Sequence, residues 1–391
     1  MITLEEAIGI IRSNSETLDA ERLDLMESLN RVLREDVIAD VDMPPFDKSA
    51  VDGFACHNDD IRETLVVVET IPAGVQPQRS IGRGQCAKIM TGAVMPEGAD
   101  CVLLREDVEE IGGQSVRFKC DRTAVNICYK GEDVVVGQKL AVSGCRITPK
   151  EVATLALAGY SRPLVSKKPR VGIIATGDEI VEPSILPEQS KIRNSNSYQL
   201  FAHCVQFGCS PTYYGIVRDE NDSILPVIKK ATDENDLVLL TGGVSAGDLD
   251  LVPAMLEQAG FEILFRGVGI QPGRPTVFGT SGGKCVFGIP GSPVASFIVF
   301  EVLVKELLAC SMGLTDFAAI SRCTLAGAIK RQKVNRMGWR PVSIGIDGKA
   351  HPVEYHGTAH ISSYAAADGI VAIPIGIAQL NEASIVDVRL I

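Results

Sequence analysis

Three acidic residues each follow a short apolar segment that has the composition of a β-strand: Glu179, Asp219 and Asp250. When parallel strands lie side by side, the segments that follow them gather at one edge of the sheet, so these carboxylates can converge. Mg²⁺ binds carboxylates together with ligand phosphates and water, and it neutralises charge as a phosphoanhydride breaks. The pattern therefore predicts a magnesium site. Acidic residues also cap helix N-termini, which is a simple alternative role for Asp219 and is compatible with metal binding.

A glycine-rich turn follows the apolar segment that ends at Leu240, and it contains Gly242, Gly243, Ser245 and Gly247. Glycines let successive backbone N–H groups approach an anion, and the serine adds a hydroxyl beside the N-terminus of the next helix. This arrangement favours a phosphate or pyrophosphate ligand. The spacing matches neither a Walker loop nor the dinucleotide-binding fingerprint. A glycine hinge that closes a buried strand is the alternative interpretation.

Two more turns follow strand-like segments, at residues 176–179 and 290–293, and the second contains Pro290, Gly291 and Pro293. All three turns are expected at one edge of the sheet. Arg274 lies on a loop stiffened by prolines, where a guanidinium can bind an oxyanion through two hydrogen bonds. Further candidate cations near these motifs are Lys48, Lys88, Arg193 and Arg266. The basic run between residues 330 and 340 is better explained as a solvated face.

Residues 43–54 form a loop without helical or strand periodicity. Pro44 and Pro45 fix two φ angles, Gly53 tolerates positive φ, and the loop carries the carboxylates of Asp47 and Asp52. A loop this rigid can present charge to a ligand. A plain Asp-Gly turn is the simpler reading of Asp52 and Gly53 taken alone.

The elements that must position these residues follow a βαβ pattern after Pro169. A parallel sheet with helices on both faces and right-handed crossovers is expected. The expected strands are residues 170–175, 211–216, 236–240 and 284–288, and the expected helices are residues 197–207, 222–230, 249–259 and 294–308.

The N-terminal part opens with a capping box, Thr3 with Glu6, which begins a helix. A second helix is expected over residues 23–34 and a third from Thr148. Between them, residues 60–145 have a β-type composition, with a hairpin turning at Gly112 and Gly113. Short alternating segments after Gly313 predict a small closing β domain.

The composition excludes several classes of protein. The chain has 391 residues, 46% of them hydrophobic, and no apolar run reaches the length of a transmembrane helix. The first residues lack the features of a secretory signal, so a cytoplasmic protein is expected. A net charge of −11 argues against a general nucleic-acid binder. The 11 cysteines include no Cys-x-x-Cys pair, so a disulfide framework or zinc ribbon is not expected.

Taken together, the motifs resemble those of the MoeA family, the molybdenum insertases of molybdenum-cofactor biosynthesis. The resemblance spans nearly the whole chain and rests on residues 44–55, 88–98, 176–179, 193–196, 241–248, 271–274 and 290–293. It implies a multidomain α/β protein: a helical stalk (1–169) with a small β domain inserted at about 46–145, a MogA-like doubly wound α/β domain that binds molybdopterin (170–313), and a C-terminal β-barrel domain (314–391). It also implies an elongated homodimer.

The implied reaction takes adenylylated molybdopterin and molybdate or tungstate, uses Mg²⁺, and releases AMP and molybdenum cofactor. The motifs cannot separate the two oxyanions. The resemblance also allows a MogA-like partner and molybdoenzyme acceptors. It assigns the polar catalytic set to Asp52, Thr91, Glu179, Asp219 and Asp250. Our hypothesis is that Glu179, Asp219 and Asp250 hold the metal while Asp52 and Thr91 orient the reacting end of the substrate. Pro290 and Pro293 would shape the pocket floor.

The chain departs from the family pattern at Cys128, where an arginine is usual. A neutral thiol cannot replace a guanidinium in oxyanion binding. Lys130 or Arg122 could substitute, or oxyanion binding could be weaker. Two other functions stay open: a MogA-like adenylyltransferase, against which the Asp52 loop and the C-terminal domain argue, and a scaffold that binds molybdopterin without turnover.

Overall fold

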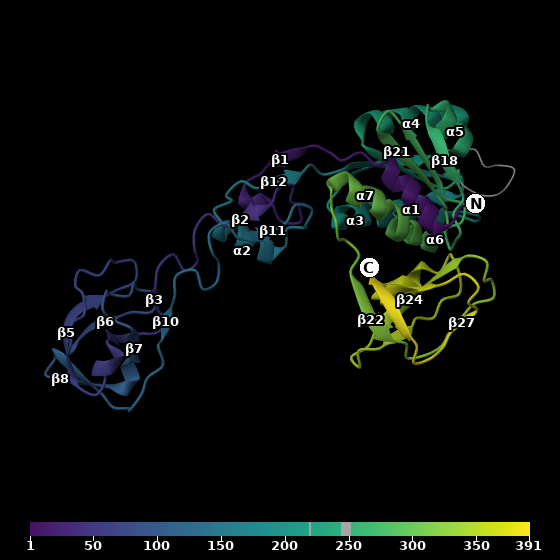
Figure 1. The fold of residues 1–391 in the computed structure, drawn as a ribbon. Helices are drawn as coiled ribbons and strands as arrows, with labels where there is room; N and C mark the ends of the chain where they lie inside the picture. The colour runs from purple at the N-terminus through teal and green to yellow at the C-terminus, as the bar shows by residue number, and fades with distance from the viewer. Residues whose placement is uncertain (219, 244–251) are drawn as a thin grey trace. The chain divides into compact units, whose positions relative to one another are not determined.

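The computed structural model describes residues 1–218, 220–243 and 252–391, which fold into two compact units (Figure 1). Unit 1 comprises Met1–Glu35, Ser143–Thr148 and Pro163–Ile391, and unit 2 comprises Asp36–Val142 and Pro149–Arg162. Each unit has hydrophobic clusters of its own.

A six-stranded sheet forms the centre of unit 1, in the order β16 (Ser210–Val217), β13 (Arg170–Thr176), β17 (Leu237–Thr241), β21 (Lys284–Ile289), β20 (Val277–Ser281) and β18 (Glu262–Arg266). The first four strands are parallel, as expected. The expectation of a wholly parallel sheet is wrong at the other end, where β20 and β18 run antiparallel. A two-residue turn of Gly282 and Gly283, both at positive φ, joins β20 to β21 as a hairpin.

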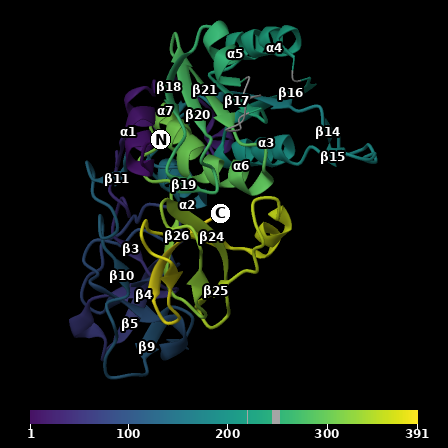
Figure 2. The same ribbon diagram turned by 90° about the vertical axis from the view of Figure 1, so that its right-hand side faces the viewer.

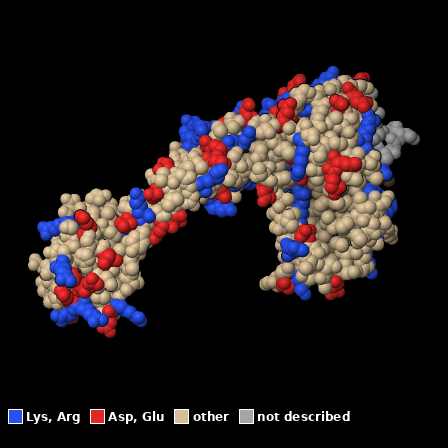
Figure 3. All heavy atoms as spheres, viewed as in Figure 1, with Lys and Arg blue, Asp and Glu red and all other residues tan. Residues whose placement is uncertain are grey.

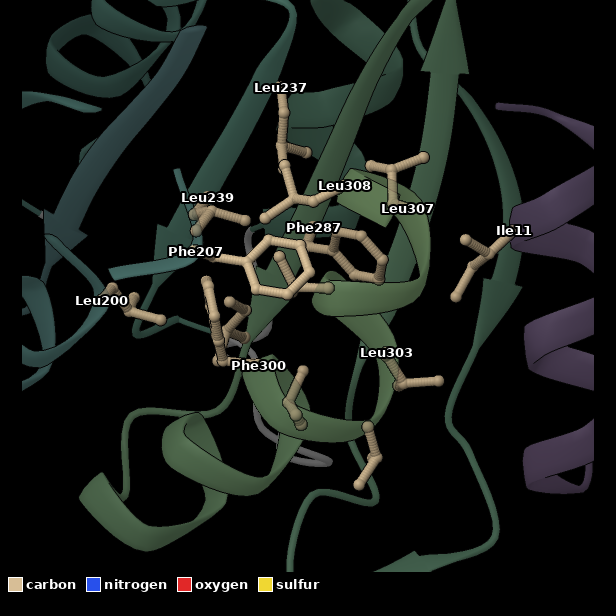
Figure 4. Close-up of a cluster of buried hydrophobic side chains, with 14 of the residues drawn as sticks. Ile11, Leu200, Phe207, Leu237, Leu239, Phe287, Phe300, Leu303, Leu307 and Leu308 are labelled. Atoms are coloured by element: carbon tan, nitrogen blue, oxygen red, sulfur yellow. The ribbon is translucent and has the colours of Figure 1, made fainter. Parts of the chain in front are cut away.

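Helices cover both faces of this sheet, as the sequence predicts (Figure 2). One face packs against α4 (Asn221–Glu234) and α5 (Val252–Gln258). The other packs against α1 (Leu4–Ser13), α3 (Asn196–Phe207), α6 (Pro293–Val299) and α7 (Lys305–Met312), with a π-helical turn at Phe300–Val304 between the last two. Strand residues alternate between the two cores: Leu237 and Leu239 face one (Figure 4), and Val238 and Leu240 face the other.

The first helix begins as expected. Thr3 accepts a hydrogen bond from the backbone N–H of Glu6, and the Glu6 carboxylate accepts one from the backbone N–H of Thr3. The expected second helix over residues 23–34 does not form. Asp24 caps a short 3-10 turn, Leu25–Glu27, and Asn30 has a φ of 64°. Val32 and Leu33 are buried and pair as isolated β-bridges, because tertiary pairing outweighs helix propensity here.

Unit 2 contains a six-stranded sheet in the order β7 (Cys101–Leu104), β4 (Gly53–Cys56), β6 (Gln85–Ile89), β5 (Thr64–Ile71), β9 (Ser115–Phe118) and β8 (Val108–Ile111). The predicted hairpin at Gly112 and Gly113 is confirmed, since it joins β8 to β9. Further pairs link β3 (Lys48–Ser49) to β10 (Ile127–Cys128), and β2 (Val37–Ile38) to β11 (Lys139–Ala141), while α2 spans Pro149–Leu157.

The C-terminal part of unit 1 builds a second sheet, in the order β19 (Ile270–Gln271), β24 (Met337–Ile344), β26 (Gly369–Ile373), β28 (Ile385–Leu390) and β22 (Ile320–Thr324), with β25 (Ala350–Pro352) beside β24. Shorter elements are β1 (Ala20–Arg22), β12 (Leu164–Ser166), β14 (Ile180–Val181), β15 (Ile192–Arg193), β23 (Ile329–Lys330) and β27 (Gln379–Leu380). Basic and acidic side chains are interspersed on the molecular face in Figure 3.

Candidate functional site

The three predicted turns meet at one edge of the central sheet. Ala175 of β13 pairs with Thr241 of β17, and Thr241 pairs with Ile289 of β21, so the segments that follow these strands leave the sheet side by side. A pocket opens between them, which we call the carboxyl-edge pocket. It is lined by Thr176, Glu179, Ile180, Ile192, Arg193, Asn194, Ser195, Asn196, Thr241, Gly242, Gly291 and Pro293. For the described residues, the expected convergence of the three strand ends is confirmed.

Glycine is required where two of these turns approach each other. A Cβ atom on Gly242 would lie 2.0 Å from the carbonyl oxygen of Thr176, and the backbone φ of Gly242 is 100°. A Cβ atom on Gly291 would lie 3.6 Å from the Cα of Gly242, an ordinary van der Waals distance, so glycine at 291 leaves the backbone uncovered without being sterically required. The pocket wall is therefore bare backbone, which lets a ligand approach peptide groups closely.

Glu179 lines this pocket with an exposed side chain that folds back over Gly177. A Cβ atom on Gly177 would lie 2.7 Å from Oε2 of Glu179. The backbone of Glu179 is held in place because its carbonyl accepts a 2.8 Å hydrogen bond from the N–H of Ile192. The carboxylate thus stands beside bare backbone at the edge of the sheet, which suits a cation bound together with a phosphorylated ligand.

Asp219, Ser245, Gly247 and Asp250 lie outside the described residues. The predicted set of three metal-binding carboxylates is therefore represented in the structure by Glu179. The described residues contain no group of three or more His, Cys, Asp or Glu side chains arranged to hold a metal ion.

Asn196 is a pocket residue that the sequence reasoning did not select. Its Nδ2 donates to Oγ1 of Thr241 (2.9 Å) and to the carbonyl oxygen of Gly291 (2.8 Å), so it ties two of the turns together. Its Oδ1 is buried and has no hydrogen-bond partner among the described residues. A buried amide oxygen without a donor costs free energy, which a ligand donor would recover. The sequence feature that could have identified Asn196 is its position in the 193–196 motif, where it becomes the first residue of α3.

Arg274 lies on a loop beyond the same sheet edge. Arg266 pairs with Val277, and Val277 pairs with Gly288 next to the end of β21, so the chain between residues 266 and 277 extends past that edge. The peptide bond between Gln271 and Pro272 is cis. The Arg274 side chain is exposed, whereas the guanidinium of Arg266 pairs with Glu257. Arg274 is therefore the better placed of these two cations to meet an oxyanion.

In unit 2, the structure brings Asp52 and Thr91 together. Oδ1 of Asp52 accepts hydrogen bonds from the backbone N–H of Thr91 (2.7 Å) and from its hydroxyl (2.8 Å). These bonds, and to a smaller extent the charge of Arg105, hold the pKa of Asp52 below its usual value. Both contacts use one oxygen of an exposed side chain, which leaves Oδ2 accessible to a ligand.

The strands of unit 2 explain why Asp52 stands where it does. Gly53 begins β4 and pairs with Ile89 on one side and Leu104 on the other. A Cβ atom on Gly53 would lie 1.9 Å from the carbonyl oxygen of Leu103, so only glycine fits. Asp47, the other acid of the loop, is structural, since its Oδ1 accepts a hydrogen bond from the N–H of Lys130 (2.7 Å).

Cys128 lies opposite Lys48 in the short β3–β10 pair. Burial, followed by the nearby Glu132 carboxyl, raises the pKa of the Cys128 thiol, so the side chain is neutral at pH 7. Of the proposed substitutes, Lys130 already forms an ion pair with Asp42, with 3.4 Å between Nζ and Oδ2. Its charge is therefore partly neutralised by the protein itself.

Two family models match the chain. The model described as "MoeA N-terminal region (domain I and II)" matches residues 2–159, and the model described as "Probable molybdopterin binding domain" matches residues 172–309. The second match covers the sheet and the carboxyl-edge pocket. The fold and the pocket thus define a protein in which a MoeA-type N-terminal region precedes a MogA-like α/β domain.

Relatives named "Molybdopterin molybdenumtransferase" include one from Bacillus subtilis, 37% identical over 318 residues that make up 78% of this chain and 74% of the relative. Another, from Staphylococcus aureus, is 36% identical over 332 residues, 83% of this chain and 79% of the relative. A solved structure of the molybdopterin biosynthesis MoeA protein from Pyrococcus horikoshii OT3 matches with a TM-score of 0.85 at 30% identity, covering 100% of both chains. The chain belongs to the molybdopterin molybdenumtransferase family, which confirms the predicted MoeA resemblance.

Proposed function

We propose that this chain catalyses the insertion of molybdenum into molybdopterin, with adenylylated molybdopterin and molybdate as substrates and AMP as a product. The main support is the position of the Glu179 carboxylate in a pocket walled by the bare backbone of Gly242 and Gly291. That arrangement suits a phosphorylated ligand bound with a cation. The names of the relatives point to the same transfer.

In this proposal, the residues at the sheet edge bind the pyrophosphate. The glycine-rich turn (Gly242, Gly243, Ser245 and Gly247) and Arg274 contact its oxygens, and Pro290, Gly291 and Pro293 shape the pocket floor. Glu179, Asp219 and Asp250 would hold Mg²⁺. Carboxylate oxygens fit this hard cation, which when bound neutralises charge on the phosphates. Asn196 keeps the two turns at a fixed spacing through its two hydrogen bonds.

Asp52 and Thr91 would orient the reacting end of the substrate. The lowered pKa of Asp52 means that its carboxylate is ionised throughout the physiological range, so it acts as an acceptor and not as a proton donor. Because these residues belong to unit 2, we also propose a homodimer in which the units of two subunits complete each site. The proposed division of the chain is 1–169, 170–313 and 314–391, with a β-barrel as the last domain.

We further propose a cytoplasmic location, with no membrane or nucleic acid as partner. None of the helices among the described residues is long and apolar enough to cross a membrane. A MogA-like enzyme that supplies the adenylylated substrate and molybdoenzymes that accept the product are the proposed protein partners.

The decisive experiment measures AMP release from adenylylated molybdopterin by the purified protein, with and without Mg²⁺, over a range of molybdate and tungstate concentrations. Release that depends on the oxyanion and on Mg²⁺ would support the insertase and give its metal preference. Tight binding of the substrate without release would indicate a carrier or scaffold. Consumption of ATP would indicate an adenylyltransferase.

An Asp250→Asn variant tests the metal assignment. We expect slower AMP release and a higher Mg²⁺ requirement, because one of three charged ligands becomes neutral. Asp222→Asn, on the helix that follows Asp219, is the matched control. If Asp250→Asn leaves both the rate and its Mg²⁺ dependence unchanged, the assignment is wrong.

A further inference from the structure

A second polar pocket lies on the α3 and α7 side of unit 1 and has no part in the proposed reaction. We call it the Arg146 pocket. It is a cavity of about 160 Å³ lined by Arg146, His203, Gln206, Phe207, Lys305 and Phe317. With about 30 Å³ for each liquid water, this space holds one small ion and a few waters. Its lining comes from the 143–148 segment, from α3 and α7, and from the chain before β22.

The charges around this pocket do not balance. Lys305 Nζ lies 2.6 Å from Oε1 of Glu301, a side chain that is only 1% exposed, and Nε of Arg389 lies 3.9 Å from Oε2 of the same carboxylate. Arg146 adds a third cation, and its positive charge contributes, after burial, to the lowered pKa of Lys305. The nearby Glu306 is already paired with Arg12 at 2.8 Å. Lys305 and Arg389 therefore share one carboxylate, and Arg146 forms no ion pair among the described residues.

His203 does not change this balance at neutral pH. Burial, followed by the charge of Lys305, lowers the pKa of His203 to about 3, so its imidazole is neutral. Its ring stacks on Phe300, with 4.8 Å between ring centroids (Phe300 is labelled in Figure 4). A neutral imidazole can donate a hydrogen bond to an anion without adding charge.

One donor close to this pocket lacks an acceptor: it belongs to Arg389, whose guanidinium lies over the ring of Phe317, a lining residue. Nη2 of Arg389 is buried and has no hydrogen-bond partner among the described residues. Arg146 uses Nη1 for the carbonyl oxygens of Asn30 (3.3 Å) and Phe207 (3.1 Å). Both Arg146 and Lys305 lie over the ring of Phe207, at 5.1 and 5.7 Å from its centroid. A buried guanidinium nitrogen without an acceptor costs free energy, and an anion in the adjacent pocket would stabilise that positive charge through its opposite charge.

The backbone at this pocket is irregular as well. Glu301 lies in the π-helical turn Phe300–Val304, and Lys305 begins α7 directly after it. Such turns insert an extra residue into a helix, which changes the direction of the side chains that follow, and they are frequent at functional sites. Here the turn places Glu301 and Lys305 together against Arg389 of β28.

We propose that the Arg146 pocket binds a small dianionic oxyanion of the phosphate or sulfate type, at a site separate from the carboxyl-edge pocket. The anion accepts hydrogen bonds from Arg146 and Lys305 and offsets the surplus positive charge that includes Arg389. In this position it links the 143–148 segment, α7 and the C-terminal strand β28. Its binding stabilises the junction of three chain segments that are distant in the sequence.

The test measures the binding of radiolabelled phosphate, and separately of sulfate, by equilibrium dialysis in chloride buffer at constant ionic strength. Gln206 is exposed at the rim and has no role in the core, so its substitution changes the charge at the pocket while the fold is preserved. We expect saturable binding by the unaltered protein, binding at least tenfold weaker in Gln206→Glu, and tighter binding in Gln206→Lys. Gln114→Glu, an equal charge change on an exposed residue of unit 2, is the control and should bind normally.

Arg146→Gln is the second variant, and we expect it to abolish measurable binding. The thermal unfolding midpoint of Arg146→Gln, measured in chloride, shows whether this variant remains folded. If it does not, the comparison of Gln206→Glu with Gln206→Lys tests the proposal. Absence of saturable binding by the unaltered protein would overturn the proposal. So would equal affinities in the two Gln206 variants, or binding that is lost in Arg274→Gln and kept in Gln206→Glu, which would place the anion at the carboxyl edge of the sheet.

Discussion

The contact between Asp52 and Thr91 shows how a single residue controls the charge of its neighbour. The Thr91 backbone N–H and hydroxyl both donate to the same oxygen of Asp52, and they stabilise the ionised form. Since the pKa of Asp52 in the folded protein lies below the unfolded value, this contact stabilises the fold above the ordinary Asp pKa. The contribution is lost as the pH falls through the lower, folded-state value.

A Thr91→Val variant should raise the pKa of Asp52 part of the way toward its ordinary value of about 3.9, because one of two donors is lost while the backbone N–H remains. Titration of the Asp52 carboxyl carbon by NMR measures this change. Thr91→Ser keeps the hydroxyl and should leave the pKa of Asp52 low. If Asp52 has the same pKa in Thr91→Val as in the unaltered protein, the Thr91 hydroxyl does not stabilise the Asp52 carboxylate.

Gly242 allows its own backbone to approach the backbone of Thr176 closely. In Gly242→Ala the new Cβ atom would lie 2.0 Å from the Thr176 carbonyl oxygen, at a positive φ that already disfavours alanine. We expect a loss of about 3 kcal/mol or more in unfolding free energy and strongly reduced AMP release. Gly215→Ala shares the positive φ (86°) but meets no atom within 4 Å, so it should cost only about 1–2 kcal/mol. Equal losses in urea unfolding would refute the steric explanation.

Substitution of Cys128 tests whether position 128 belongs to an oxyanion site in unit 2. We expect Cys128→Arg to tighten molybdate binding about tenfold to a hundredfold, because a charge-assisted hydrogen bond contributes roughly 1.5–3 kcal/mol. The dependence of AMP release on molybdate concentration measures this effect. Cys120→Arg, at an exposed cysteine of the same unit, is the control. An unchanged molybdate dependence would mean that position 128 is not an oxyanion ligand in this chain.

At the scale of elements, α1 illustrates a start signal that could be read directly from the sequence. The Thr3 and Glu6 side chains satisfy two backbone N–H groups of the first turn, and Leu4, Ala7 and Ile11 are buried in the main core of unit 1. We expect Thr3→Ala to lower the unfolding free energy by about 1 kcal/mol and Thr3→Ser to have little effect. Chemical denaturation of the two variants measures the difference, and equal midpoints would show that the cap does not stabilise the helix.

The elements that were predicted correctly have local causes, and those that were missed depend on distant partners. Short apolar segments that end in glycine turns, each followed by a capped helical stretch, predicted the four parallel strands and the helices around them. Residues 23–34 contain helix-forming types, but Val32 and Leu33 pair with residues more than a hundred positions away. The turn of Gly282 and Gly283 carried a recognisable hairpin signal that was not used. The 193–196 motif pointed to Asn196, but its role could not be predicted, since its two acceptors come from other turns.

At the scale of the whole molecule, the two units are expected to unfold separately. Phe54 is buried in a cluster confined to unit 2, and Phe278 in a cluster confined to unit 1. Phe54→Ala and Phe278→Ala each remove a large buried ring, at a cost of about 3–5 kcal/mol. In scanning calorimetry, each should lower the temperature of a different transition. A single transition that moves equally in both variants would show that the units unfold together.

The order of the units along the chain has a consequence for biosynthesis. Helix α1 packs on a core supplied by strands and helices from β13 onward, and β1 pairs with β12, whose residues follow those of unit 2. At ribosomal rates of about 5–20 residues per second, residues 1–35 are synthesised roughly ten seconds to a minute before these partners. Residues 36–142 leave the ribosome in the meantime with their own sheet complete. The N-terminal helix, although made first, is therefore among the last parts to reach its final packing.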